Sequence, residues 1–208
     1  MKKIGVILSG CGYLDGAEIR ESVLTLLSIE KHGATYVLFA PNIDQHHVIN
    51  HLTNTEISQT RNVLEESARI ARGEIKDIDN LDMNDLDGLI IPGGFGVAKN
   101  LSDLAFNGAG SKINEKFNSI LHQCLELKKP IGAICISPAV ICLSFNKIEP
   151  KLTIGNDQDT ANVINSLGGV HQNSGADDIV VDNANKIVST GAYMHEKASL
   201  LEISVGID

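Results

Sequence analysis

The sequence predicts an α/β sandwich with a mostly parallel sheet and an antiparallel addition near the C-terminus. Short apolar runs typical of buried strands alternate with segments whose apolar residues recur at helical spacing. Two late apolar runs, 179–182 and 186–190, flank Asn183-Ala184-Asn185 and predict a hairpin. With 208 residues, 43% of them apolar, the chain can bury one sizeable core, which predicts one domain over 1–208.

Each expected element follows from its local pattern of apolar residues and from the residues that end it. Gly33 ends the first helix, Pro41 stops the second strand, and Thr60 is the expected N-cap of the next helix. The segment 42–60 is polar and irregular. In chain order we expect a strand over 4–8, a helix over 17–32, a strand over 36–40, a helix over 61–72, an extended piece over 74–78, a strand over 86–91, a short helix near 98–105, a helix over 113–127, a strand up to Cys135 with a helix after it, a strand over 152–155, a helix over 159–167, the hairpin, and a final helix over 193–205.

Cys135 is the first candidate nucleophile. The apolar run that ends at Cys135 turns at once into Ile136-Ser137-Pro138-Ala139, which predicts a strand, a sharp turn and a helix. At the carboxyl end of a parallel strand and under a helix N-terminus, the dipole and free N–H groups are expected to favour a thiolate and a nearby oxyanion. The alternative is a buried cysteine that only fills space.

A glycine-rich turn gives a second candidate feature. The buried strand over 86–91 runs into Pro92-Gly93-Gly94-Phe95-Gly96, where the backbone can approach a ligand without a Cβ in the way. Gly93 and Gly94 are therefore candidate oxyanion donors, together with the N–H group of Ile136. The spacing does not match the nucleotide-binding glycine motifs.

Composition and charge exclude several classes of protein. A formal charge of −9 argues against a nucleic-acid partner. No apolar stretch approaches the length of a membrane span, and Met1-Lys2-Lys3 leads into too short an apolar run for a signal peptide. The four cysteines form no C-x-x-C pair or disulfide framework. We expect a cytoplasmic protein without a metal site or cofactor.

The motifs resemble those of the ElbB, or enhancing-lycopene-biosynthesis, family within the PfpI/ThiJ branch of the class I glutamine amidotransferase-like superfamily. Many short motifs occur in one order from end to end, which makes the resemblance specific. They are Gly5-Val6-Ile7-Leu8-Ser9-Gly10-Cys11-Gly12, Asp15-Gly16-x-Glu18, Arg61-Asn62-Val63-Leu64, Arg72-Gly73-Glu74-Ile75, Ile91-Pro92-Gly93-Gly94-Phe95-Gly96-x-Ala98-Lys99-Asn100-Leu101, Cys135-Ile136-x-Pro138-Ala139, Leu152-Thr153-Ile154-Gly155 and Asp177-Asp178-Ile179-Val180-Val181-Asp182. The resemblance implies a flavodoxin-like three-layer sandwich, a homodimer, and a nucleophile-elbow cysteine at Cys135. The chain stops at Asp208, slightly short of such relatives, so a trimmed final helix is expected.

The resemblance also implies a glutamate on the helix after the first strand that reaches the nucleophile. Glu18 and Glu21 both lie at the start of that helix, three residues apart. The Asp15-Gly16-x-Glu18 motif favours Glu18, whereas counting back from Gly33 favours Glu21, which we place slightly ahead. At least one of the two carboxylates only complements the helix N-terminus.

One departure from the wider superfamily concerns histidine. Many PfpI/ThiJ proteins have histidine directly after the nucleophile, where this chain has Ile136. His195 falls near the place of the His-x-Glu pair of glutamine amidotransferases, but here the order is His195-Glu196, and a histidine on a helix surface is the favoured interpretation.

Three further residues are candidates for the pocket. Cys11 follows the first strand and either lines the site or, the favoured interpretation, is a small residue in a tight crossing. Lys99 and Asn100 could supply positive potential or a hydrogen bond at the mouth, although most lysines are solvated.

Two hypotheses about function follow. The resemblance implies a glutathione-independent glyoxalase, a lyase-type enzyme that converts glyoxal or methylglyoxal to glycolate or lactate through a cysteine hemithioacetal, with a link to isoprenoid biosynthesis. The alternative is a non-enzymatic redox-sensing or regulatory protein that uses the same cysteine. Amidotransfer is less favoured because the acid spacing is wrong and no synthetase domain is fused.

Overall fold

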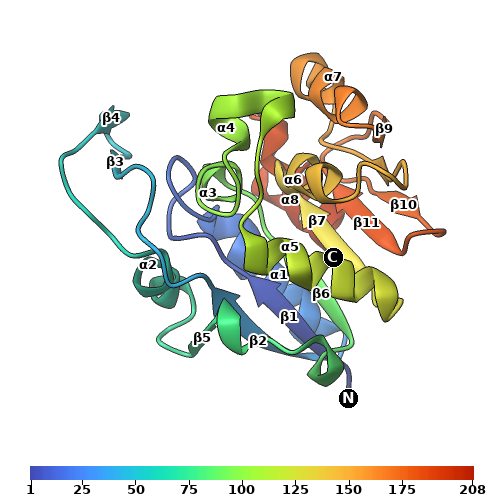
Figure 1. The fold of residues 1–208 in the computed structure, drawn as a ribbon, viewed down its shortest axis with the longest axis horizontal. Helices are drawn as coiled ribbons and strands as arrows, with labels where there is room; N and C mark the ends of the chain where they lie inside the picture. The colour runs from blue at the N-terminus through green and yellow to red at the C-terminus, as the bar shows by residue number, and fades with distance from the viewer.

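A seven-stranded sheet organises the chain, and the computed structural model describes all of it, residues 1–208. The strands lie in the order β10-β11-β7-β6-β1-β2-β5, and neighbours are parallel except for β10 with β11. Figure 1 shows β5 at one edge of the sheet and β10 at the other. The expected fold class, with its late antiparallel addition, is confirmed.

The strands of the main sheet are β1 (Lys3–Ile7), β2 (Thr35–Ala40), β5 (Ile75–Asp77), β6 (Gly88–Ile91), β7 (Ile131–Ile134), β10 (Val180–Asp182) and β11 (Ile187–Thr190). The helices are α1 (Ile19–Lys31), α2 (Val63–Ile70), α3 (Phe95–Lys99), α4 (Leu104–Asn107), α5 (Glu115–Glu126), α6 (Ser137–Ser144), α7 (Gln158–Ser166) and α8 (Leu200–Ile207). Two small sheets pair β3 (Ile49–Asn50) with β4 (Thr55–Glu56) and β8 (Lys151–Leu152) with β9 (Val170–His171).

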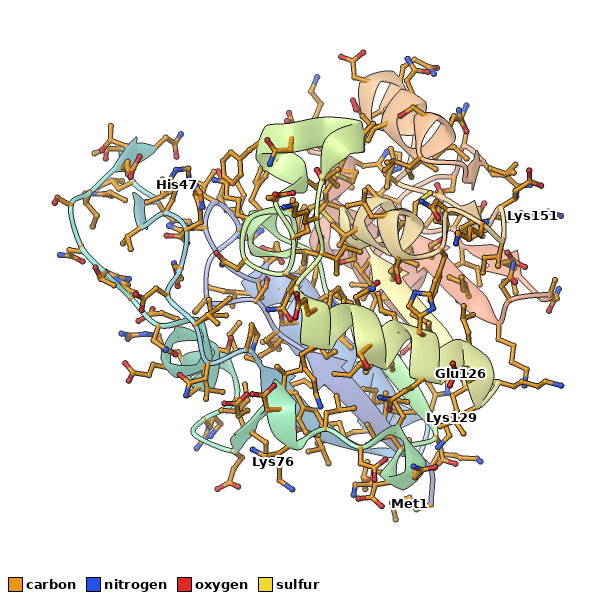
Figure 2. The ribbon with its side chains drawn as sticks, in the orientation of Figure 1. Met1, His47, Lys76, Glu126, Lys129 and Lys151 are labelled. Atoms are coloured by element: carbon orange, nitrogen blue, oxygen red, sulfur yellow. The ribbon has the colours of Figure 1, made fainter.

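Apolar side chains on both faces of the sheet make the three layers. Because successive residues of a strand point to opposite faces, Ile7 of β1 belongs to the largest core cluster while Val6 belongs to a second one. The largest cluster includes residues of α3, α5 and α6, and the second includes residues of α1 and α2. In Figure 1, α5 crosses in front of the sheet. Charged side chains such as those of Lys76 and Lys151 project from the edge of the molecule (Figure 2).

The chain changes direction across the sheet between β1 and β6. From β1 it proceeds outward to β2 and β5, whereas from β6 it proceeds to β7 and β11 on the other side. In open α/β sheets, the loops at the carboxyl ends of strands beside such a switch point form the binding crevice. The loops after β1, β6, β7 and β11 therefore lie together.

Two helices begin later than the apolar pattern predicts, because their caps decide the start. Asn62, rather than Thr60, is the N-cap of α2, and its side chain accepts from the N–H groups of Leu64 and Glu65. The final helix does not begin at 193. A 3₁₀ turn occupies Ala192–Met194, and α8 starts only after Ser199, which forms a capping box with Glu202.

Two other segments also differ from expectation. The segment 42–60, expected to be irregular, carries the β3–β4 pair and forms an arm that projects beside α2 (Figure 1). The strand expected over 152–155 is limited to β8, because the N–H groups of Thr153 and Ile154 donate to the side chains of Ser189 and His171 and not to the backbone of a neighbouring strand. No helix combines the length and the apolar character needed to cross a bilayer.

Candidate active site at an elbow cysteine

Cys135 sits at a sharp turn between β7 and α6. Its φ of 63° lies in the left-handed region, which non-glycine residues adopt at some cost in energy. The turn is held on both sides, since the Cys135 N–H group donates to the carbonyl of Thr190 at 2.9 Å and the Ser137 hydroxyl donates to the carbonyl of Pro92 at 3.0 Å. This geometry directs the cysteine toward the loop that follows β6.

The Gly93-Gly94 turn packs directly against the cysteine. A Cβ on Gly93 would lie 2.3 Å from the Cys135 Cβ and 2.6 Å from the Glu21 Oε2, so only glycine fits there. Gly94 has a φ of 96°, and a Cβ there would lie 2.3 Å from the carbonyl oxygen of Gly16. The N–H groups of Gly94 and Ile136 both donate to the Cys135 sulfur. These two donors are where an oxyanion formed beside the sulfur could be stabilised.

The structure brings Glu21, in the first turn of α1, to the cysteine. Glu21 is fully buried, its Oε2 accepts from the Gly93 N–H group at 2.9 Å, and its Oε1 accepts from the Tyr193 N–H group at 3.2 Å. Its carboxyl group is also hydrogen-bonded to the Cys135 thiol. The carboxyl group is thus fixed by two backbone donors and faces the sulfur.

Glu18 has a different position and contacts the helix rather than the thiol. Its side chain caps α1 by accepting from the Glu21 N–H group at 2.6 Å, and its own N–H group donates to the carbonyl of Gly93 at 2.9 Å. Burial raises the pKa of Glu18, and hydrogen bonds from the N–H groups of Glu21 and Arg20 oppose this. The two carboxylates therefore differ, with Glu21 at the sulfur and Glu18 at the helix start.

The electrostatics of the site favour protons on both groups. Burial, and then the nearby Glu18 charge, raise the pKa of Glu21 to about 8, against the opposing hydrogen bonds from Tyr193, Cys135 and Gly93. Burial and the Glu21 carboxylate raise the pKa of the Cys135 thiol well above its usual value, although the Gly94 and Ile136 N–H groups lower it. The expectation of a thiolate stabilised by the helix N-terminus is therefore wrong, because desolvation and a like charge outweigh the two donors.

Two other candidate residues lie at the end of α3, where Lys99 is the last helical residue and Asn100 is the C-cap. The Lys99 Nζ donates to the carbonyl of Leu14 at 2.8 Å, and burial lowers the pKa of Lys99. Asn100 is buried, and its amide nitrogen donates to the carbonyls of Ser9 and Asp15 while its Oδ1 accepts from the His46 N–H group. Both residues tie the loop after β1 to its neighbours.

Cys11 is half-buried on the same loop, and its charged neighbours belong mainly to α2. Burial and then Glu66 raise its pKa, while Arg69 lowers it. Cys135 and Glu21 are not among the groups that shift the pKa of Cys11. The preceding residue, Gly10, donates its N–H group to the Ser67 hydroxyl of α2, so Cys11 lies beside α2.

His195 follows the 3₁₀ turn after β11, outside α8. Its ring packs on two glycines, since a Cβ on Gly155 would lie 2.6 Å from the His195 Nε2 and a Cβ on Gly191 would lie 3.2 Å from its Cδ2. Nε2 is buried and has no hydrogen-bond partner. The expected position on a helix surface is wrong, because Ala192 starts a separate turn with a φ of 41°.

The residue that sequence reasoning missed is Tyr193, whose backbone N–H group binds Glu21. Any residue type has such a donor, so the sequence carries no signal for it. His, Cys, Asp and Glu side chains form no group of three or more that could hold a metal ion.

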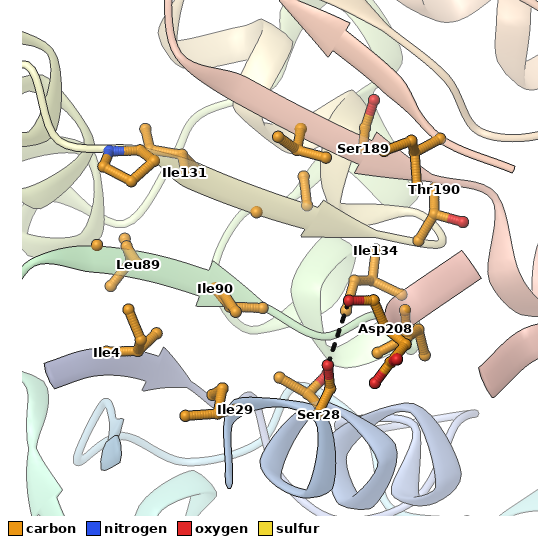
Figure 3. Close-up of a pocket in the computed structure, with 18 of the residues that line it drawn as sticks. Ile4, Ser28, Ile29, Leu89, Ile90, Ile131, Ile134, Ser189, Thr190 and Asp208 are labelled. Atoms are coloured by element: carbon orange, nitrogen blue, oxygen red, sulfur yellow. Dashed lines mark hydrogen bonds between the residues drawn. The ribbon is translucent and has the colours of Figure 1, made fainter. Parts of the chain in front are cut away.

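An apolar cavity lies away from these residues. A cavity of about 340 Å³ lies between α1, α8 and the sheet, and its lining includes Ile4, Gly88 and Ile131 near the amino ends of β1, β6 and β7. Figure 3 shows Ser28 and Asp208, joined by a hydrogen bond, at its rim. Neither Cys135 nor Glu21 lines it.

Comparisons with known proteins identify the family. No family model matches the sequence. The human mitochondrial protein named glutamine amidotransferase-like class 1 domain-containing protein 3 is 39% identical over 206 residues, which cover 94% of this chain and 76% of the human protein. The crystal structure of an isoprenoid biosynthesis protein with amidotransferase-like domain from Ehrlichia chaffeensis has a TM-score of 0.93 and 41% identity, covering 100% of this chain and 94% of that one.

A more distant structure agrees in fold alone. A DJ-1 superfamily protein of Agrobacterium tumefaciens has a TM-score of 0.54 and 14% identity, covering 100% of this chain and 88% of that one. The two relatives above 30% identity show that the chain belongs to the class I glutamine amidotransferase-like superfamily.

Proposed function

We propose that this protein is a glutathione-independent glyoxalase of the lyase type, acting on glyoxal or methylglyoxal. The observation that carries the proposal is the pair of a fully buried Glu21 carboxyl group and the Cys135 thiol, joined by a hydrogen bond. A nucleophile beside a single proton carrier is what an internal redox rearrangement of a dicarbonyl needs. A group with a pKa of about 8 can both release and accept a proton near neutral pH.

The reaction begins with addition of the thiol to one aldehyde carbon. A sulfur–carbon bond forms, and the thiol proton passes through the carboxyl group to the aldehyde oxygen, giving a hemithioacetal. As negative charge develops on that oxygen, the Gly94 and Ile136 N–H groups, which point at the sulfur, stabilise it.

Glu21 then moves a proton between the two carbons. Its carboxylate removes the proton from the carbon bonded to sulfur, and the hydroxyl proton of the hemithioacetal passes to the second oxygen by way of an enediol. Glu21 then returns the carbon-bound proton to the neighbouring carbon, which leaves a thioester. Water hydrolyses the thioester to glycolate, or to lactate from methylglyoxal, and restores the thiol. One carbon is oxidised and the other reduced, so no external oxidant is required.

We expect slow turnover. Ile136 occupies the position after the nucleophile, so no imidazole assists the thiol there. General acid–base assistance contributes about 10²–10⁴-fold, and one carboxyl group supplies only part of it.

The test is conversion of glyoxal to glycolate by the purified protein, followed by proton NMR without glutathione and with and without a chelator. We expect activity that the chelator does not change, that Cys135→Ala abolishes and that Glu21→Gln strongly reduces. Glu202→Gln is the matched control, because Glu202 occupies the same helix position in α8 as Glu21 does in α1. His195→Ala should change the rate little.

Failure to consume aldehyde above the Cys135→Ala background would reject the glyoxalase. The alternative of a redox-regulatory protein would then be favoured by formation of a stable oxidised Cys135 under mild peroxide. A large loss of activity in His195→Ala would instead indicate an amidotransferase-like pair.

Two broader proposals accompany the activity. The name of the Ehrlichia chaffeensis relative supports a link to isoprenoid biosynthesis, which a change in isoprenoid content on deletion of the gene would test. We also propose a cytoplasmic location, although the human relative is named as mitochondrial. Fractionation of the native cell would test it.

A further inference from the structure

The turn after β11 places one backbone donor on the buried carboxyl group. Ala192 is fully buried with a φ of 41°, and the 3₁₀ turn over Ala192–Met194 points the Tyr193 N–H group at the Glu21 Oε1, 3.2 Å away. Tyr193 and Glu21 are 172 residues apart in sequence. Their contact therefore depends on how the turn is held against α1.

Arg20 holds that turn from α1. Its Nη1 donates to the Tyr193 hydroxyl at 3.0 Å, and its guanidinium carbon lies 5.8 Å from the centre of the Tyr193 ring. No carboxylate lies within ion-pair distance of Arg20. Arg20 directly precedes Glu21, so one helical turn carries both the Glu21 carboxyl group and the Arg20 side chain. Arg20 binds the side chain of Tyr193, and the N–H group of Tyr193 donates to Glu21.

We propose that Arg20 and Tyr193 form a clamp that orients the Glu21 carboxyl group toward the Cys135 thiol. Both are positioning residues, and their role in turnover rests on the proposed function. With Oε1 held by Tyr193 and Oε2 by Gly93, the carboxyl plane is fixed and its remaining acceptor sites face the sulfur. The terminal torsion of glutamate is otherwise broad, so loss of one donor lets the carboxyl group turn away.

The clamp also affects how readily Glu21 gives up its proton. The groups around Glu21 that carry or share charge are Glu18 on α1, Cys135 at the elbow, and Arg20 with Tyr193 in the clamp. The Tyr193 N–H group favours the charged carboxylate and opposes the effects of burial and of Glu18. Release of this donor should therefore raise the pKa of Glu21 further.

The experiment is a carbon-13 NMR titration of protein labelled at the glutamate carboxyl carbon, with Glu21→Gln used to assign the signal. In Tyr193→Phe and Arg20→Leu, we expect the titration midpoint of Glu21 to rise by about 0.5 unit, the size expected for one weakened hydrogen bond. Arg20→Lys should restore part of the shift, since lysine can still donate to the hydroxyl. Tyr36→Phe and Arg69→Leu are matched controls, because Tyr36 interacts with Glu30 and Arg69 pairs with Glu66.

Aldehyde turnover gives the second readout. The clamp predicts a lower kcat with a similar KM, and a rising limb of the pH–rate profile displaced to higher pH by the same amount as the NMR midpoint. Unchanged Glu21 midpoints in both Tyr193→Phe and Arg20→Leu would overturn the clamp. A shifted midpoint in a protein that consumes no aldehyde would support the clamp as the device that orients Glu21 and would reject only the glyoxalase. Both variants alter side chains that are exposed or half-buried, and the circular dichroism spectrum would verify that each is folded.

Discussion

Cys135 illustrates how burial and charge compete at a single residue. A helix N-terminus stabilises a nearby anion by about 0.3–1 kcal/mol and by about 2 kcal/mol in partly buried sites. Complete burial of an ionisable group shifts its pKa by up to about 3–5 units, which corresponds to roughly 4–7 kcal/mol. Cys135 is only 7% exposed and lies against Glu21. Burial is therefore the larger effect, and it raises the pKa of the thiol, which keeps its proton.

Glu21 should make the protein less stable as the pH rises. Its pKa is 4.5 in a model peptide and about 8 in the fold, so between these values the unfolded chain releases the proton while the native protein keeps it. The contribution of Glu21 to the free energy of unfolding is therefore fully present below pH 4.5 and is lost by about pH 8. The total loss is on the order of 5 kcal/mol. Glu21→Gln cannot ionise and should not show this loss.

Urea unfolding at a series of pH values measures the effect. The free energy of unfolding of the wild type should fall relative to that of Glu21→Gln between pH 5 and pH 8, while Glu202→Gln should follow the wild type. Parallel curves for the wild type and Glu21→Gln would show that Glu21 is not buried as described.

Gly93→Ala should disrupt the site by crowding alone. The added Cβ would overlap the Cys135 Cβ at 2.3 Å, and such overpacking costs about 1–3 kcal/mol. We expect lower stability in urea and loss of aldehyde turnover. Gly110→Ala is the control, because a Cβ there meets nothing within 4 Å. Equal stability of the two variants would contradict the close contact between the glycine turn and the elbow.

At the scale of the element, caps rather than apolar periodicity decide where the helices begin. Thr60 and Asn62 are both residue types that cap helices, but Asn62 supplies two hydrogen bonds to the first turn of α2 that Thr60 does not. Glu18 has the corresponding role for α1, and this cap places Glu21 in the first turn, within reach of Cys135. A capping contact thus affects the geometry of the candidate site.

Asn62→Ala should destabilise the protein by about 1 kcal/mol, because the N–H groups of Leu64 and Glu65 lose their acceptor. Thr60 is exposed and outside the helix, so Thr60→Ala should change stability by less than about 0.5 kcal/mol. Urea denaturation of both variants tests the assignment. A larger loss in Thr60→Ala would mean that the helix starts at the residue predicted from sequence.

At the scale of the whole molecule, the order of the strands assembles the candidate site. Glu21 lies on the helix that follows β1, and Gly93, Cys135 and Tyr193 follow β6, β7 and β11. These four strands are consecutive neighbours in the sheet, in the order β11-β7-β6-β1. Residues separated by as many as 172 positions therefore meet at one end of the sheet.

Gly206→Ala should loosen the docking of α8 on this assembly. A Cβ there would lie 2.3 Å from the carbonyl oxygen of Ala176 and 2.8 Å from the Thr190 Oγ1. Ile203 of α8 belongs to the same apolar cluster as Cys135, so displacement of α8 should expose the elbow. We expect a loss of about 1–3 kcal/mol in urea and faster alkylation of Cys135, measured by mass spectrometry. An unchanged alkylation rate in a destabilised variant would show that α8 does not cover the elbow.

The sequence by itself determined the sheet class, the hairpin at its end, a glycine-rich turn after one strand and a cysteine at the turn from another strand to a helix. These features depend on local chemistry: apolar runs predict buried strands, and a glycine turn permits close approach of the backbone. The choice between Glu18 and Glu21, the protonation of Cys135 and the contact from Tyr193 were decided only by the tertiary structure. Each depends on distances across the sheet and on exclusion of water from Glu21, which arise when distant strands pack together.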